Sequence, residues 1–321
     1  MGAARRILGV LYGMEWAVVA RRVLLGLAAG EALSLPQLLG VEPPEAPSGV
    51  YGIDVGGGLA YGSVTESAVL LALSLDEGCG FNPSLYASML AERADLENPL
   101  RHYASSTVEA LMHVRRGVPW GRARQLVTST EPPLEAVARA APLPLFYRSR
   151  RLAAEMAAAQ ALTTSLDLEV ARAARLYASA LHYTLTGLPP EEALAEAALE
   201  EPLGPIRSAV LTALEEAEHG REPPAQGHTP GPMDGYMVAS TVAAAAYAAS
   251  ASRTVREAAW LASRWPGAEP RTAAAVASSL LAASGRAADL EELAARLEAR
   301  ELVEKAARAL EAARARCIFE E

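Results

Sequence analysis

Apolar residues recur along most of the chain with the spacing that places them on one face of a helix. The stretch at 21–39 is mostly apolar, whereas the last stretch, at 290–316, alternates apolar and charged residues. No segment of useful length has the strict alternation that is typical of strands. The predicted helices span residues 21–39, 64–75, 83–94, 106–117, 153–162, 168–187, 191–200, 207–219, 238–250, 254–263, 272–283 and 290–316.

Two irregular segments interrupt this helical pattern. Residues Glu42–Gly62 and Gly220–Asp234 are rich in proline and glycine, but neither has the charge or serine runs of a free linker. Gly26 and Gly30 lie four residues apart on the first long helix, where their small size would allow another helix to approach closely. We therefore expect one compact all-α domain.

The composition fits this prediction and narrows the class of protein. Alanine, leucine, glutamate and arginine, which lose little entropy in helices, dominate the chain. The formal charge of −9 argues against a nucleic-acid partner, because such binding needs a basic face. The uncharged run at 235–252 is too weakly hydrophobic to indicate a membrane span.

The two cysteines, Cys79 and Cys317, lie far apart and have no metal-binding spacing. No signal peptide is evident, so we expect two reduced cysteines and a cytoplasmic location. The five histidines form no zinc motif. Gly56–Gly58 is interpreted as a flexible loop, because no phosphate-binding motif follows it.

Three segments in the first half carry a more specific signal. The sequence reads GLAAGEALSLP at Gly26–Pro36, VTESAVLLALSL at Val64–Leu75 and ARAAPLPL at Ala138–Leu145. In the same order, these segments resemble the motifs GLxxGDALGxP, TDDTxMALAL and MRxAPLGL of the ADP-ribosylglycohydrolases.

Three further segments continue the resemblance in the same order. They are QALTTSLDLEVARAARLYASAL at Gln160–Leu181, GYMVASTVAAAAYA at Gly235–Ala248 and GAEPRTAAAVASSLLAASG at Gly267–Gly285. The resemblance implies a helical glycohydrolase-like domain over residues 21–316. Residues 1–20, including Trp16, form an N-terminal extension that either covers the first helix or contacts a partner.

The family holds two Mg²⁺ or Mn²⁺ ions between two helix starts, using threonines and four aspartates. Here Thr65, Glu66, Glu269 and Thr272 stand at ligand positions, whereas Arg271 stands where the family has an aspartate. Four carboxylates are thereby reduced to two with one guanidinium, a net charge of −1. We therefore expect a degenerate metal site and no cofactor, with Mg²⁺ or Mn²⁺ if the site works.

Arg271 itself has two interpretations. It either replaces an ion and pairs with Glu66 and Glu269, which we favour, or points to solvent at a helix start. Glu66 and Glu269 are also the candidate catalytic carboxylates. A neighbouring guanidinium would depress the pKa of both and suit them poorly to act as acids.

Three residues are candidates for ligand binding. Glu31 replaces the aspartate of the first motif, Arg139 matches the arginine of MRxAPLGL, and Tyr236 could stack on an adenine. Arg139 could equally cap a helix, and Tyr236 could be a core aromatic. The glycine loop that approaches the phosphates in the family is replaced by EPPLEAVAR at Glu131–Arg139.

Three functions follow from these substitutions. We favour a non-catalytic relative retained as a binding or structural protein, or one of altered ligand specificity. ADP-ribose or another nucleotide-like molecule is the candidate ligand. The alternatives are an active hydrolase that cleaves ADP-ribosyl glycosidic bonds with divalent metal, and a metal-free hydrolase that uses Glu66 or Glu269. No oligomeric state is predicted.

Overall fold

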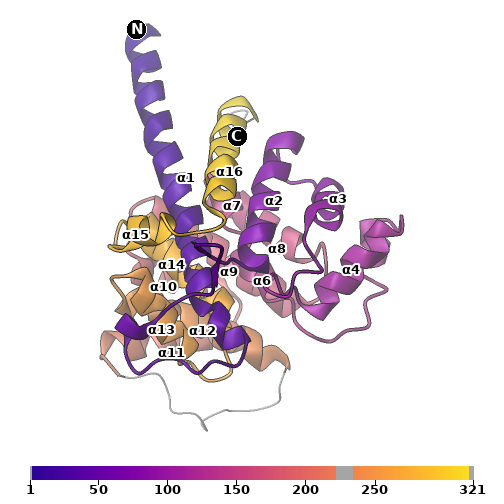
Figure 1. Ribbon diagram of the computed structural model, residues 1–321. Coiled ribbons are helices and arrows are strands. Elements are labelled where there is room, and N and C mark those ends of the chain that lie inside the picture. The colour runs from indigo at the N-terminus through magenta and orange to yellow at the C-terminus, as the bar shows by residue number, and fades with distance from the viewer. Residues whose placement is uncertain (1, 222–233, 318–321) are drawn as a thin grey trace.

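The computed structural model describes residues 2–221 and 234–317, and the regular secondary structure of these residues is almost entirely helical (Figure 1). The segment Gly220–Asp234, predicted to be irregular, lies largely outside the described residues. The helices are α1 (Gly2–Leu38), α2 (Ser63–Gly78), α3 (Pro83–Arg93), α4 (Ser105–Arg115), α5 (Trp120–Ala123), α6 (Glu135–Ala138), α7 (Pro142–Phe146), α8 (Arg150–Ala161), α9 (Leu168–Leu185), α10 (Pro190–Glu200), α11 (Pro205–Glu218), α12 (Asp234–Ala251), α13 (Val255–Ser263), α14 (Pro270–Ala283), α15 (Leu290–Ala294) and α16 (Arg300–Cys317), with a 3-10 turn η1 (Pro47–Gly49).

Helix α14 lies at the centre of the fold, and every residue from Arg271 to Ala282 is buried. It packs against α1, α12 and α13 on one side and against α9 and α6 on the other. The glycines of α1 permit this contact. A Cβ on Gly30 would lie 2.4 Å from the carbonyl oxygen of Ala274, and one on Gly26 would lie 2.6 Å from that of Ser278. The predicted close approach at these two glycines is confirmed.

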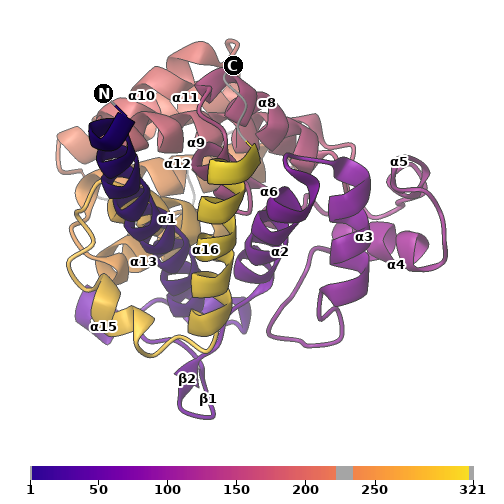
Figure 2. The ribbon, with the colours of Figure 1, turned by 90° about the horizontal axis from the view of Figure 1, so that it is seen from above.

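Figure 2 shows α1, α16 and α2 side by side, with α3, α4 and α5 forming a shoulder beyond α2. The N-terminal part of α1 projects past the body of the molecule (Figure 1). The predicted boundary at residue 20 therefore falls within a continuous helix. On that helix, the indole nitrogen of Trp16 donates to the carbonyl of Leu145, and Arg314 of α16 lies 3.9 Å from its ring centroid.

All twelve predicted helices are present, but the last one is divided. Residues 54–59 form a small antiparallel hairpin, β1 (Asp54–Val55) and β2 (Gly58–Leu59), which the pattern did not predict. Gly56 and Gly57 both have positive φ, as a tight hairpin turn requires. The backbone of Leu59 then bonds to Arg296 and Glu298, and this pairing separates α15 from α16.

The prediction of two reduced cysteines is wrong in this structure, where Cys79 and Cys317 form a disulfide. Cys79 follows the end of α2 and Cys317 ends α16, so the packing of these two helices brings together thiols that are distant in sequence. The cytoplasmic location stays a prediction. Among the described residues, no helix is long and apolar enough to cross a membrane.

Candidate functional site

The starts of α2 and α14 face a common polar centre, and Glu31 of α1 caps the first of them. Its carboxylate is fully buried and accepts hydrogen bonds from the backbone of Gly62, Val64 and Thr65 at 3.0, 2.8 and 2.9 Å. The N-terminal N–H groups of a helix have no partners within the helix, and an anion there is favourable. Glu31 thus acts as a cap supplied by another helix; a contact with a ligand stays a prediction.

Glu269 caps α14 in a similar way, from its own N-cap position. Oε2 accepts from the backbone of Thr272 at 2.7 Å, and Oε1 accepts from Nε of Arg271 at 2.8 Å. Burial alone would raise the pKa of Glu269, but Arg271 and the bonds from Thr272 outweigh it and hold this pKa below its ordinary value. The expected depression of the pKa by a guanidinium is therefore present at Glu269.

Arg271 is buried, with only 4 % of its surface exposed, so it does not point to solvent. Besides its ion pair with Glu269, Nη1 donates to the carbonyl oxygen of His102 at 3.2 Å. Burial opposes its charge, yet Glu269, Glu31 and Glu135 raise the pKa of Arg271 above its ordinary value. The guanidinium is therefore a permanent positive charge between the two helix starts.

The other half of the predicted pair is wrong, because Glu66 does not contact Arg271. Glu66 accepts from the hydroxyl of Tyr103 at 2.8 Å and from the backbone of Asp95 at 3.0 Å, and pairs with Nε of Arg101 at 3.8 Å. The Glu66 side chain is directed instead toward the segment between α3 and α4, which supplies all three of these partners. Burial raises the pKa of Glu66, despite the lowering effects of these three partners.

Arg101 was not predicted from the sequence, because it lies in a non-helical segment between α3 and α4 that matches no motif. It is buried, with Nη1 2.6 Å from the carbonyl oxygen of Tyr61 and Nη2 3.4 Å from Oε1 of Glu298. Its guanidinium carbon lies 3.5 Å from the centroid of the Tyr61 ring. A second arginine thus occupies the polar centre beside Glu66.

The donor set of this centre does not fit two divalent cations. The carboxylates of Glu31, Glu66 and Glu269 already accept bonds from backbone N–H groups, a phenol or guanidinium groups. Among the described residues, no group of three acidic, histidine or cysteine side chains is arranged to hold a metal. The hydroxyls of Thr65 and Thr272 are buried without a hydrogen-bond partner, but neutral oxygens alone do not offset divalent charge.

Arg139 lies fully buried next to this centre. Nε donates to the side-chain oxygen of Gln160 at 2.8 Å, and Nη2 donates to the backbone of Gln160 and to the hydroxyl of Thr164. These bonds fasten the end of α6 to the end of α8. Nη1 has no hydrogen-bond partner. The geometry gives Arg139 a structural role, and ligand binding by it stays a prediction.

Glu135 also lies in the centre and was not predicted to be there. It accepts from the hydroxyl of Thr107 at 2.6 Å and is buried in a segment whose prolines suggested only a lost phosphate loop. Burial raises the pKa of Glu135, although Arg139 and Arg271 both lower it. The buried carboxylate of Glu135 therefore follows two prolines, in the segment that corresponds to the family's glycine-rich, phosphate-binding loop.

Tyr236 lies in the first turn of α12 and is half-buried. Its ring packs so close to Gly267 that a Cβ there would lie 2.7 Å from Cε1 of the tyrosine. This contact brings Tyr236 to the loop that precedes Glu269. Stacking on an adenine stays a prediction.

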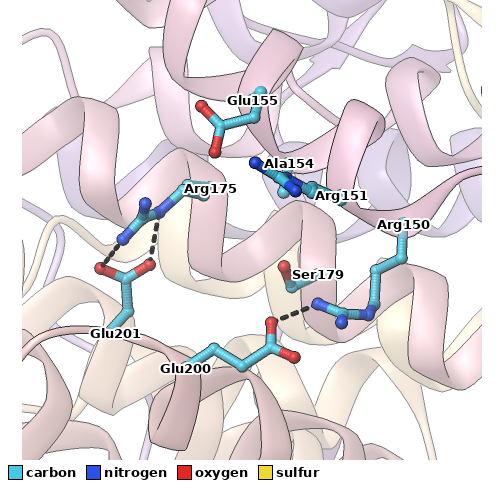
Figure 3. A pocket seen from close by; sticks show the side chains of 8 residues that line it. All are labelled: Arg150, Arg151, Ala154, Glu155, Arg175, Ser179, Glu200 and Glu201. Atoms are coloured by element: carbon cyan, nitrogen blue, oxygen red, sulfur yellow. Dashed lines mark hydrogen bonds and ion pairs between the residues drawn. The ribbon is translucent and has the colours of Figure 1, made fainter.

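A cavity of about 220 Å³ lies away from this centre, between α8, α9 and the end of α10 (Figure 3). Arg175 makes a bidentate ion pair with Glu201, with both distances 2.8 Å, and Arg150 pairs with Glu200. The first pair joins α9 to the end of α10, and the second joins the start of α8 to that same end. The cavity walls therefore have a structural explanation.

Comparison with known proteins agrees with this fold. The family model of ADP-ribosylglycohydrolases matches residues 18–318. A solved structure described as an ADP-ribosylglycohydrolase-related protein complex is similar to the chain, with a TM-score of 0.67 and 26 % identity over 93 % of this chain and 98 % of that one. No match was found among curated proteins. On the extent of the family match, the chain belongs to the ADP-ribosylglycohydrolase family.

Proposed function

We propose that this chain is a family member that has lost metal-dependent hydrolysis and keeps the helical scaffold for a structural or ligand-binding role. The ion pair between the buried Arg271 and the partly buried Glu269 carries this proposal, with Nε of the arginine 2.8 Å from Oε1 of the glutamate. The guanidinium lies at a position where the family has an aspartate, so a positive charge replaces a ligand for positive ions.

Electrostatics supports the proposal. A divalent cation beside Arg271 would add positive charge next to a buried, permanently charged guanidinium. Each uncompensated buried charge costs several kcal/mol even after the surroundings relax. Expelling Arg271 would break its ion pair with Glu269 and its bond to the carbonyl oxygen of His102. The arginine and a pair of ions therefore exclude each other.

For metal-free acid–base catalysis, the direction of the pKa shift suits only one of the two candidate glutamates, Glu66, to act as an acid. The pKa of Glu269 is lowered, which suits it poorly as an acid, whereas the pKa of Glu66 is raised. Glu66 is, however, fixed by Tyr103, Asp95 and Arg101. A general acid must reach the proton acceptor on its substrate, so these bonds favour a structural role for Glu66.

The proposal is tested by assaying release of ADP-ribose from peptides that carry ADP-ribosyl-arginine or ADP-ribosyl-serine, in excess Mg²⁺ or Mn²⁺. No turnover is expected. Turnover that a chelator abolishes would support the alternative of an active metal-dependent hydrolase, and turnover that survives the chelator would support the metal-free one.

Ligand binding is tested separately by thermal unfolding with ADP-ribose, with and without Mg²⁺. A ligand at a hundredfold excess over its Kd stabilises the folded state by about 2.7 kcal/mol. A shift with ADP-ribose that does not depend on Mg²⁺ would support a retained nucleotide-like ligand. The variant Thr65→Asp with Arg271→Asp serves as a comparison, because gain of metal binding there would show that the scaffold still accepts ions.

A further inference from the structure

The segment between α3 and α4 contacts the starts of both α2 and α14. At its beginning, the backbone N–H of Asp95 donates to Glu66 of α2. At its end, the hydroxyl of Tyr103 donates to that same carboxylate, and Nε of Arg101 lies 3.8 Å from it in a longer ion pair. Between them, the carbonyl oxygen of His102 accepts from Arg271 of α14. Three consecutive residues thus reach both helix starts.

The backbone at His102 is specialised for this contact. Its φ is +41°, in the left-handed region that residues with a side chain rarely adopt. In this conformation its carbonyl oxygen accepts both from Nη1 of Arg271 and from the hydroxyl of Ser63, each at 3.2 Å. One backbone oxygen thereby links the first residue of α2 to the first turn of α14.

We propose that Arg101 and Arg271 form one guanidinium clamp, joined through His102, that holds the starts of α2 and α14 together without ions. Arg271 pairs with the helix-start carboxylate of Glu269 at 2.8 Å. Arg101 lies between two carboxylates, that of Glu66 at the start of α2 at 3.8 Å and that of Glu298 at 3.4 Å. Each also donates to a backbone carbonyl, that of Tyr61 or of His102. Arg101 is the positioning residue that the sequence motifs leave unassigned.

The chemistry of the guanidinium suits this role. It presents five donors in a fixed plane and stays protonated, so one side chain can bind a carboxylate and a carbonyl at once. Both arginine side chains are buried, with 7 % and 5 % exposed. The inference rests on the proposed function only in holding that ions are absent, and it adds which residues replace them.

A double-mutant cycle tests the clamp. Arg101→Ala and Arg271→Ala are each expected to lower the melting temperature in a chelator by on the order of 5 °C, because each removes a buried guanidinium from a partly buried carboxylate. The melting temperature of the double variant should fall by clearly less than the sum of the two single decreases, since either single change already breaks the link between the starts of α2 and α14. Arg172→Ala, which breaks an exposed ion pair with Glu169, is the matched control and should shift the melting temperature by about 1 °C or less.

A second measurement separates the clamp from ordinary core packing. The double variant removes both positive charges that repel cations from this centre, so any rise in melting temperature with Mn²⁺ alone should be confined to the double variant. Wild type should show no Mn²⁺-dependent shift. If an alanine variant does not fold, the cycle is repeated with Arg101→Lys and Arg271→Lys, which keep the charge but not the planar fork.

The clamp would be overturned if the decreases in melting temperature of the two single variants simply add in the double variant. It would also be overturned if Arg101→Ala lowers the melting temperature no more than Arg172→Ala does. A Mn²⁺ shift in wild type would overturn it too. Hydrolysis by wild type that persists in a chelator would instead overturn the proposed function, while leaving the clamp intact. The two failures are therefore distinguishable.

Discussion

Nε of the buried Arg271 lies 2.8 Å from Oε1 of the partly buried Glu269, two residues before it at the start of α14. The equivalent glutamate on α2, Glu66, lies 3.8 Å from Nε of Arg101, and among the described residues no charged donor lies within hydrogen-bond distance of it. The two carboxylates therefore have pKa values shifted in opposite directions, Glu269 downwards and Glu66 upwards.

Glu269→Gln should destabilise the protein by about 3 kcal/mol at neutral pH, because it leaves Arg271 buried without its counter-ion. The folded state lowers the pKa of Glu269, so the stabilisation from its charge is present above the unfolded pKa and is lost as pH falls through the folded value. The difference between wild type and variant should therefore shrink on acidification. Urea unfolding of both proteins, measured at intervals of about one pH unit from about pH 3 to about pH 7, checks this trend.

Glu66→Gln should show the opposite trend. The folded state raises the pKa of Glu66, so it binds this proton more tightly than the unfolded chain does, and the contribution of Glu66 falls as pH rises above the unfolded pKa. The variant cannot titrate here, so it should gain stability relative to wild type as pH increases. Parallel trends in the two glutamine variants would contradict the assignment of separate environments to the two glutamates.

The contact between α1 and α14 gives a prediction about packing. Gly30→Ala should lower stability by about 1–3 kcal/mol, because the added carbon would meet the backbone of Ala274 at 2.4 Å. Gly121 is the matched control, since it lies in helix α5 with open space around it. Gly121→Ala should be neutral or stabilising. Equal effects of the two substitutions, measured by chemical denaturation, would rule out a packing role for Gly30.

Most helices could be predicted because their apolar spacing is a local signal, and the glycines of α1 marked a close contact. The break between α15 and α16 could not be predicted, because it arises where the backbone of Leu59 bonds to Arg296 and Glu298. Tertiary hydrogen bonds of this kind leave no period in the sequence.

In the candidate site, too, local contacts could be predicted from the sequence and contacts between distant segments could not. The pairing of Arg271 with Glu269 joins neighbours in one helix start, so the motif was enough to predict it. The pairing of Glu66 with Arg101 joins two segments that no motif relates. Glu135 was interpreted only as part of a lost glycine loop, although it lies buried among the charges of the centre.

The disulfide predicts a redox-dependent stability. Cys317→Ser should lower the free energy of unfolding by about 2–4 kcal/mol, because the bond closes a long loop in the unfolded chain and holds the end of α16 on α2. Reductant should lower the melting temperature of wild type to that of the variant and leave the variant unchanged. A reductant-insensitive wild type would show that the two thiols are not joined in solution.

Substitutions of Arg139 and of its partner Thr164 distinguish a structural role of this arginine from a role in ligand binding. Arg139→Met keeps much of the side-chain length but leaves Gln160 and Thr164 without their charged donor, so a loss of about 3 kcal/mol is expected. Thr164→Val, which removes one of these bonds, should cost about 1 kcal/mol. If the role is structural, both variants lose stability while any affinity for ADP-ribose, measured by calorimetry below their melting temperatures, stays at the wild-type value. Lost affinity in Arg139→Met with wild-type affinity in Thr164→Val would instead assign the unpartnered Nη1 to a ligand.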